Sequence, residues 1–226
     1  MILLVLAAAF WVGVHVGIAG TAVRGRLAGR LGDSGFRGAF SLLSVLAISL
    51  LVVAWKSAPF VPLWRLPAAG NWVIVATMLA AFVLFAGSVL TPNATSVGQE
   101  KALGRKATGM FRVTRHPMLW SFALWGVCHI VSNGNVAAIL FFGAFALTAV
   151  LGMPSIDAKI AAREPARFAA YARVTSIIPF VAIAAGRNRF APAELWRPVL
   201  TGMAAWALML YVHPYIFGMP AVPAGQ

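Results

Sequence analysis

The chain has 226 residues, of which 61% are hydrophobic and only 10% are charged. This composition excludes an ordinary soluble domain and predicts an all-α integral membrane protein, organised as one multi-pass domain over residues 1–226. A net charge of +13 would suit nucleic acid, but the positions of the basic residues explain it better, and the single cysteine excludes an internal disulfide.

Six apolar stretches are each long enough to cross the roughly 30 Å hydrocarbon core of a bilayer. In chain order they cover about residues 1–20, 38–55, 71–90, 117–132, 136–153 and 196–217. The first is expected to be a retained span, because its basic residues follow the apolar run and do not precede it. The shorter stretch from Thr175 to Gly186 is predicted to be re-entrant or interfacial. Asn133 and Gly134 predict a tight turn between the fourth and fifth spans.

The basic residues are distributed unevenly along this topology. All but two of the 18 Lys and Arg residues fall in the three loops on one side, the exceptions being Lys56 and Arg65. Because cytoplasmic loops are enriched in positive charge, both termini are predicted to be periplasmic, and the basic face should attract anionic lipid head groups. All acidic residues are predicted to lie outside the spans, which disfavours cation-coupled transport and paired-carboxylate catalysis: Asp33, Glu100, Asp157, Glu164 and Glu194.

Three of the four histidines are predicted to lie inside spans. They are His15, His129 and His213, while His116 stands at the cytoplasmic end of the fourth span, directly before Pro117. An ionisable group inside a membrane indicates a functional site by default, because its unpaired burial costs several kcal/mol. Neutral imidazole binds iron, copper and zinc, and a haem needs only one or two histidines. The alternative is a hydrogen bond between helices, above all for His213.

Two of these histidines share a pattern that suits a flat aromatic macrocycle. Trp11 precedes His15 by four residues, and Trp125 precedes His129 by four residues. Residues at this spacing share one face of a helix. The sequence therefore predicts two sites at which an indole and an imidazole lie together.

The spacing of the histidines restricts the ligand pair. His116 precedes His129 by 13 residues, or about 20 Å along a helix, so both cannot bind one iron from a continuous helix. A pair must come from different spans. His15 with His129 and His129 with His213 both stay possible.

Several motifs together resemble the NnrU family of bacterial inner-membrane proteins and the related 15-cis-zeta-carotene isomerases. They are "FWVGVH", "RHPMLWSFALWGVCHIVSNGN", "TSIIPF" and "VHPYIFG". The resemblance implies a link to denitrification and nitrogen-oxide metabolism, or haem b-dependent isomerisation of a cis double bond in a polyene. Its haem ligands correspond to His15 and His129. The isomerase also has a cysteine a few residues before the second histidine, where this chain has Gly126, with Cys128 displaced.

The resemblance also suggests roles for Arg115 and His116, which lie at the cytoplasmic end of the fourth span. His116 is expected either to cap its helix or, together with Arg115, to bind a haem propionate. The substrate implied is a small apolar molecule or a nitrogen oxide, and respiratory or denitrification proteins are possible partners.

Two alternative functions stay open. The "RHPM" motif, with Arg115 and His116, also resembles membrane methyltransferases of the isoprenylcysteine and phospholipid type. There, Glu164 and Tyr171 would complete a site for S-adenosylmethionine. The second alternative is a non-enzymatic maturation factor for respiratory reductases.

Overall fold

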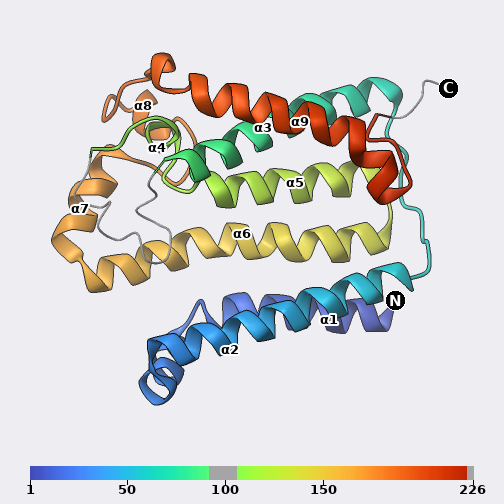
Figure 1. The fold of residues 1–226 in the computed structure, drawn as a ribbon, viewed down its shortest axis with the longest axis horizontal. Helices are drawn as coiled ribbons and strands as arrows, with labels where there is room; N and C mark the ends of the chain where they lie inside the picture. The colour runs from blue at the N-terminus through green and yellow to red at the C-terminus, as the bar shows by residue number, and fades with distance from the viewer. Residues whose placement is uncertain (92–105, 223–226) are drawn as a thin grey trace. The chain divides into compact units, whose positions relative to one another are not determined.

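The computed structural model describes residues 1–91 and 106–222, which contain helices and loops with no strand among them (Figure 1). The all-α prediction is confirmed. Predictions that involve Glu100, Lys101 and Arg105 lie outside the described residues. The helices are α1 (Ile2–Val12), η1 (Gly13–Ile18), α2 (Ala22–Lys56), α3 (Ala68–Leu90), α4 (Met110–Val113), α5 (Pro117–Asn133), α6 (Val136–Arg163), α7 (Pro165–Val174), α8 (Val181–Ala184), η3 (Pro192–Glu194) and α9 (Trp196–Phe217).

Four of the described helices are long and apolar enough to cross a membrane, namely α2, α3, α6 and α9. Residues 2–18 form a shorter apolar helix, and α5 has 17 residues. The chain is thus an α-helical membrane protein. Six spans and periplasmic termini stay predictions.

Contacts divide the chain into two compact units. Unit 1 comprises Met1–Leu66 and Trp125–Ser155, and unit 2 comprises Pro67–Leu124 and Ile156–Gln226. Each unit is described separately. Since the boundaries fall within α5 and α6, both of these helices contribute residues to both units.

Unit 1 is built on closely packed small side chains. Its core combines Leu4, Ala7 and Ala8 of α1 with residues of α2 and α6, namely Leu51, Ala54, Ala137 and Ala144. Small side chains let helix backbones approach closely, which is how membrane helices gain packing energy.

Helix α2 is longer than the predicted span. It begins after Thr21, whose Oγ1 accepts a hydrogen bond from the backbone N–H of Val23, and it bends at Gly32, where φ is +72°. Hydropathy detects only the apolar part of this helix, whereas its first turns carry arginine and glycine.

The predicted turn between α5 and α6 is confirmed. Gly134 has a φ of +58°, in the left-handed region that glycine adopts without strain. Its carbonyl accepts hydrogen bonds from the backbone N–H groups of Leu63 and Trp64, at 2.8 and 3.1 Å. The turn therefore holds the loop that follows α2.

Unit 2 is organised around α3 and α9, which pack side by side in opposite directions (Figure 1). A Cβ atom added to Gly202 of α9 would lie 2.7 Å from Cα of Val83, so glycine permits the close approach. One turn further along α9, the indole of Trp206 donates a hydrogen bond to the backbone carbonyl of Val75 in α3, at 3.0 Å.

One end of unit 2 is fixed by a charged network. Arg112 donates to both carboxylate oxygens of Glu194, each at 2.9 Å, and also to Oδ1 of Asn188 at 2.8 Å. The backbone N–H of Gly109 completes the set at 2.6 Å. The hydrogen bonds from Arg112 lower the pKa of Glu194 to about 2.

The segment 175–186, which the sequence predicts to be re-entrant or interfacial, lies at this end of unit 2. It consists of bends and the single turn of α8.

Candidate functional site

His15 lies in a π-helical turn at the end of α1. The N–H of Ala19 bonds the carbonyl of Val14, five residues earlier, at 3.2 Å. Single π-turns in α-helices are often found at functional sites. Nδ1 of His15 lies 2.9 Å from the carbonyl oxygen of Trp11, and the two rings stack with centroids 3.9 Å apart. Phe40 of α2 meets the imidazole edge-on at 5.5 Å.

His129 repeats this arrangement on α5. Its Nδ1 lies 2.8 Å from the carbonyl oxygen of Trp125, four residues earlier. Its ring stacks on Phe142 of α6 at 4.6 Å, and the indole of Trp125 lies 5.0 Å away. Both predicted indole–imidazole pairs are therefore present, and both belong to unit 1.

A backbone carbonyl can only accept a hydrogen bond, so each of these imidazoles must carry its proton on Nδ1. Nε2 is then the nitrogen with the lone pair. This is the tautomer that metal-binding histidines commonly adopt, with Nδ1–H bonded to a carbonyl and Nε2 directed at the metal. The hydrogen bonds thus prepare both His15 and His129 for ligation.

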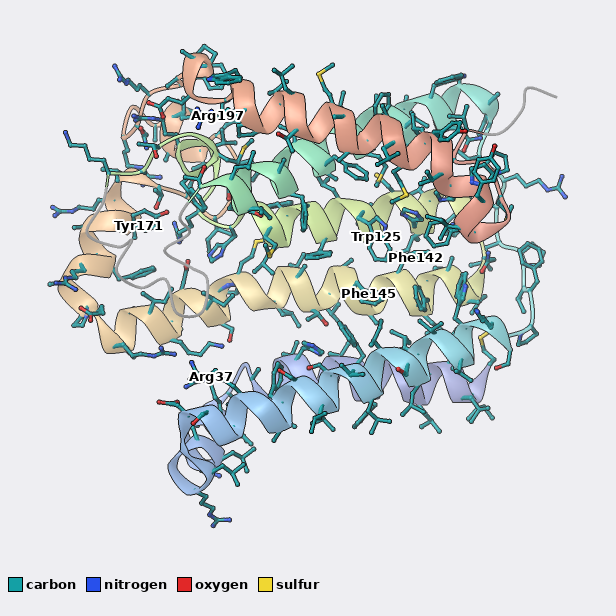
Figure 2. All side chains as sticks on the ribbon, viewed as in Figure 1. Arg37, Trp125, Phe142, Phe145, Tyr171 and Arg197 are labelled. Atoms are coloured by element: carbon teal, nitrogen blue, oxygen red, sulfur yellow. The ribbon has the colours of Figure 1, made fainter. Side chains whose placement is uncertain are left out.

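One phenylalanine connects the two pairs. Phe145 of α6 lies 4.7 Å from Trp11 and 5.3 Å from Trp125. Figure 2 shows Trp125, Phe142 and Phe145 together where α5 faces α6. We name the set the aromatic–histidine cluster: Trp11, His15, Phe40, Trp125, His129, Phe142 and Phe145.

The helix directions order this cluster. Trp11 meets Phe145, and the carbonyl of Gly20 accepts a hydrogen bond from Ser155 Oγ at 2.9 Å, so α1 runs parallel to α6. Helix α5 runs antiparallel to α6 because a tight turn joins them. His15 and His129 therefore lie about one helical turn beyond their tryptophans in opposite directions, on either side of Phe145.

The donor set of this cluster fits a haem. Two imidazoles are surrounded by aromatic rings, and the indole Nε1 of Trp11 is buried with no hydrogen-bond partner in the described part of the chain. An unsatisfied buried N–H costs about 1–3 kcal/mol. Because His15 and His129 lie on either side of Phe145, a group held by both would have to move the aromatic side chains packed around them.

His116 occupies a different environment, in unit 2. Its side chain is only 1% exposed, and Nε2 lies 2.9 Å from Oδ1 of Asp157. Arg115 donates to Oδ2 of the same carboxylate from Nε and Nη2, at 2.8 and 2.6 Å. Nδ1 of His116 is buried without a hydrogen-bond partner among the described residues. We name these residues the Arg115–His116–Asp157 triad.

The sequence did not identify Asp157 as part of a site. It was expected in a cytoplasmic segment beyond the fifth span, and it lies buried in the last part of α6. One feature of the sequence could have identified it. The chain has only five acidic residues, so each one near an apolar stretch is a candidate partner for a buried cationic side chain. Both Arg115 and His116 bind Asp157, and their proposed contact with a haem propionate stays a prediction.

The residues of the methyltransferase alternative are only partly brought together. Tyr171 of α7 is buried near the triad, and burial raises the pKa of its hydroxyl above the ordinary value. Glu164 instead precedes α7 and pairs with Arg167 at 3.6 Å, where both side chains are exposed.

His213 lies near the end of α9 in unit 2. Its Nδ1 is 2.6 Å from the carbonyl oxygen of Met219, and the ring of Phe217 lies 4.7 Å away. The alternative ligand pair of His129 and His213 therefore draws on both units. Within the described ranges, no group of three or more His, Cys, Asp or Glu residues is placed to hold a metal ion.

Comparison with known proteins identifies relatives over most of the chain. The sequence model of a family described as NnrU protein matches residues 3–221. The chain is 28% identical to the chloroplastic 15-cis-zeta-carotene isomerase of Arabidopsis thaliana over 199 residues, which is 83% of this chain and 53% of that protein. It is 29% identical to the Zea mays protein of the same name over 82 residues, 36% of this chain and 22% of that protein. The chain thus spans about half the length of the Arabidopsis relative. No solved structure matches it significantly.

Proposed function

Because the chain belongs to the NnrU family, we propose that it is a haem b-binding membrane protein in which His15 and His129 would hold the haem. The observation that supports this most directly is the shared geometry of the two imidazoles. Each has Nδ1 bonded to the carbonyl four residues earlier, and each lies in the aromatic–histidine cluster of unit 1.

The reaction proposed is cis–trans isomerisation of a double bond in an apolar polyene. Two relatives carry the name 15-cis-zeta-carotene isomerase, and an apolar substrate suits a site lined by aromatic rings inside a membrane protein. When bound, haem b supplies an iron centre that can exchange one electron or act as a Lewis acid. The rings of Trp11, Trp125 and Phe145 exclude water and offer flat apolar surfaces. Nitrogen-oxide metabolism, linked to denitrification, is the second candidate.

The membrane topology is part of this proposal. The basic residues support six spans in a bacterial inner membrane with both termini in the periplasm. In that arrangement, residues 2–18 and α5 span the bilayer together with the four longer helices, and they carry the two proposed ligands.

The first test is the absorption spectrum of the protein purified in mild detergent from cells with ample haem. Oxidised and reduced spectra, with a pyridine haemochrome assay, should give one b-type haem per chain. His15→Ala and His129→Ala should each lose most of it. His213→Ala is the control, and it should keep the haem when haem is counted per folded protein. A colourless wild type would refute the proposal, and loss in His213→Ala instead of His15→Ala would replace the ligand pair.

A second test addresses the reaction. Membranes with the wild-type protein and with His129→Ala are incubated with a cis polyene, and the isomers are separated by chromatography. Conversion by the wild type alone supports the isomerase. A haem-loaded protein that leaves the isomer ratio unchanged would favour nitrogen-oxide chemistry.

A further inference from the structure

The residues that follow α7 expose large apolar side chains at one end of unit 2. Ile178 is 59% exposed and Phe180 is 52% exposed, and Val181 and Phe190 are also exposed. Exposed apolar side chains gathered in one short loop indicate an interaction surface. The arginines of the same loop, Arg187 and Arg189, are exposed as well.

Phe180 adopts a backbone conformation that is unusual for its type. Its φ is +65°, and it is the one residue other than glycine with a positive φ among those described. This conformation costs a bulky L-residue roughly 1–2 kcal/mol. Its backbone N–H donates to the carbonyl of Val113, and its own carbonyl accepts from Ala184, both at 2.8 Å. Glycine would adopt the same φ without strain. The strained backbone therefore indicates that the exposed aromatic side chain of Phe180 contributes a contact of its own.

The start of α9 places this loop at the level of lipid head groups. Helix α9 has 22 residues, about 33 Å, which matches the hydrocarbon thickness of a bilayer. Its first residue, Trp196, is 57% exposed, and the guanidinium of Arg197 lies 5.1 Å from the indole centroid. Tryptophan at the end of a spanning helix lies in the interfacial region.

Arg187 is held rigidly beside a pocket in this loop. Its Nη1 donates to the carbonyls of Ala172, Arg173 and Thr175, at 3.3, 2.9 and 3.3 Å. The pocket has a volume of about 350 Å³. Its lining includes two arginines, Arg187 and Arg115 of the triad, together with the hydroxyl-bearing Ser176 and apolar side chains such as Ile178.

The charge of this end of the unit suits an anion. Arg187 and Arg189 lie on the loop itself, and Arg173 lies in the last turn of α7. Glu194, the nearest acidic residue along the chain, is neutralised by Arg112 at 2.9 Å. The loop therefore places a fixed guanidinium in the lining of a partly apolar pocket, and the loop itself carries no carboxylate.

We propose that this end of unit 2 binds an anionic phospholipid, with the phosphate on Arg187 and with Ile178, Phe180 and Val181 inserted beside the acyl chains. Fixed arginine suits phosphate because its planar fork donates two parallel hydrogen bonds. The lipid comes from the surrounding bilayer. This site uses no residue of the aromatic–histidine cluster, and it shares with the haem proposal only Arg115, which lines the pocket and is also predicted to bind a haem propionate.

The test uses the full-length protein, delipidated in detergent and given phosphatidylglycerol or phosphatidylcholine with identical acyl chains. Native mass spectrometry counts the lipids retained. The wild type should retain phosphatidylglycerol in preference. Arg187→Gln should lower that retention about fivefold, the effect of losing one surface cation near a membrane. Arg30→Gln removes an exposed charge from α2 in unit 1 and is the matched control.

A second variant keeps the test decisive if Arg187→Gln folds poorly. Phe180→Gly relieves the backbone strain and removes the apolar anchor, so thermal stability in lipid-free detergent should not fall while phosphatidylglycerol retention does. Equal losses in Arg187→Gln and Arg30→Gln would overturn the proposal, because general charge would then explain the preference. Unchanged retention in Phe180→Gly would also overturn it. Displacement of the lipid by millimolar inorganic phosphate would show a site for free phosphate instead.

Discussion

The aromatic–histidine cluster and the Arg115–His116–Asp157 triad use the same residue type in opposite ways. In the cluster, His15 and His129 bond to backbone carbonyls and contact aromatic rings. In the triad, His116 bonds to a carboxylate that also binds Arg115. Each carbonyl accepts a hydrogen bond from Nδ1 and leaves Nε2 to other contacts, whereas the carboxylate of Asp157 binds Nε2 of His116.

The difference separates the two proposed ligands, His15 and His129, from a histidine that belongs to a buried charge network. A neutral imidazole with its proton on Nδ1 is prepared to bind a metal through Nε2. An imidazole held by a buried carboxylate and arginine belongs to a charge network, whose members depend on one another. Substitutions in the two regions should therefore affect different properties, namely haem content in the cluster and stability in the triad.

The largest effect on stability is expected from Asp157→Ala. It leaves Arg115 buried without its carboxylate, which typically costs about 3–5 kcal/mol. Thermal unfolding of the purified protein measures the loss, and haem per folded chain should stay unchanged. Asp33→Ala is the matched control, because Asp33 is 75% exposed and pairs with Arg24 at 3.7 Å, so its loss should cost under about 1 kcal/mol. Similar unfolding of both variants would show that the triad is not a buried network.

Gly126→Ala is expected to have a smaller effect on stability and to lower haem content as well. The added Cβ would lie 2.8 Å from the carbonyl oxygen of Phe142. Helix α5 must then shift against α6 at a cost of about 1–3 kcal/mol, which displaces Trp125 and His129 and should lower haem content.

Gly143→Ala on the facing helix is the control for that variant. Its Cβ would meet its nearest neighbour, the Ile130 side chain, at 3.9 Å, which is ordinary contact. Alanine should stabilise that helix by about 0.5–1 kcal/mol. If Gly126→Ala were as stable as Gly143→Ala and kept its haem, close packing of α5 on α6 would not position His129.

The smallest effect is expected at acid pH, from a charged group outside both regions. The pKa of Glu194 falls from 4.5 to about 2 in the folded chain because Arg112 and the Gly109 N–H bind its carboxylate. A lowered folded-state pKa stabilises the protein above the unfolded pKa, so this contribution is full above about pH 4.5 and is lost as the pH falls toward 2. Unfolding measured across that range should show a loss in the wild type that Glu194→Gln lacks. Identical profiles would show that Glu194 does not contribute.

The sequence predicted those features that depend on near neighbours in the chain. The turn at Gly134 and the pairing of each histidine with the tryptophan four residues earlier follow from local geometry. The triad does not, because Asp157 lies 41 residues after His116 and reaches it only through helix packing. The junction at Phe145 is missed for the same reason. The start of α2 is missed because arginines and glycines hide a helix from a hydropathy argument.

The π-helical turn at His15 changes the direction in which side chains point around the helix axis on either side of it. A π-turn contains one residue more than the α-turn it replaces, so it rotates everything before it relative to everything after it by about 100°. Deleting Val16 or Gly17 would restore a regular helix and would keep Trp11 and His15 on one face, but it would rotate the residues after the turn relative to that face. The turn therefore sets how the chain that leads into α2 is directed relative to the Trp11–His15 pair.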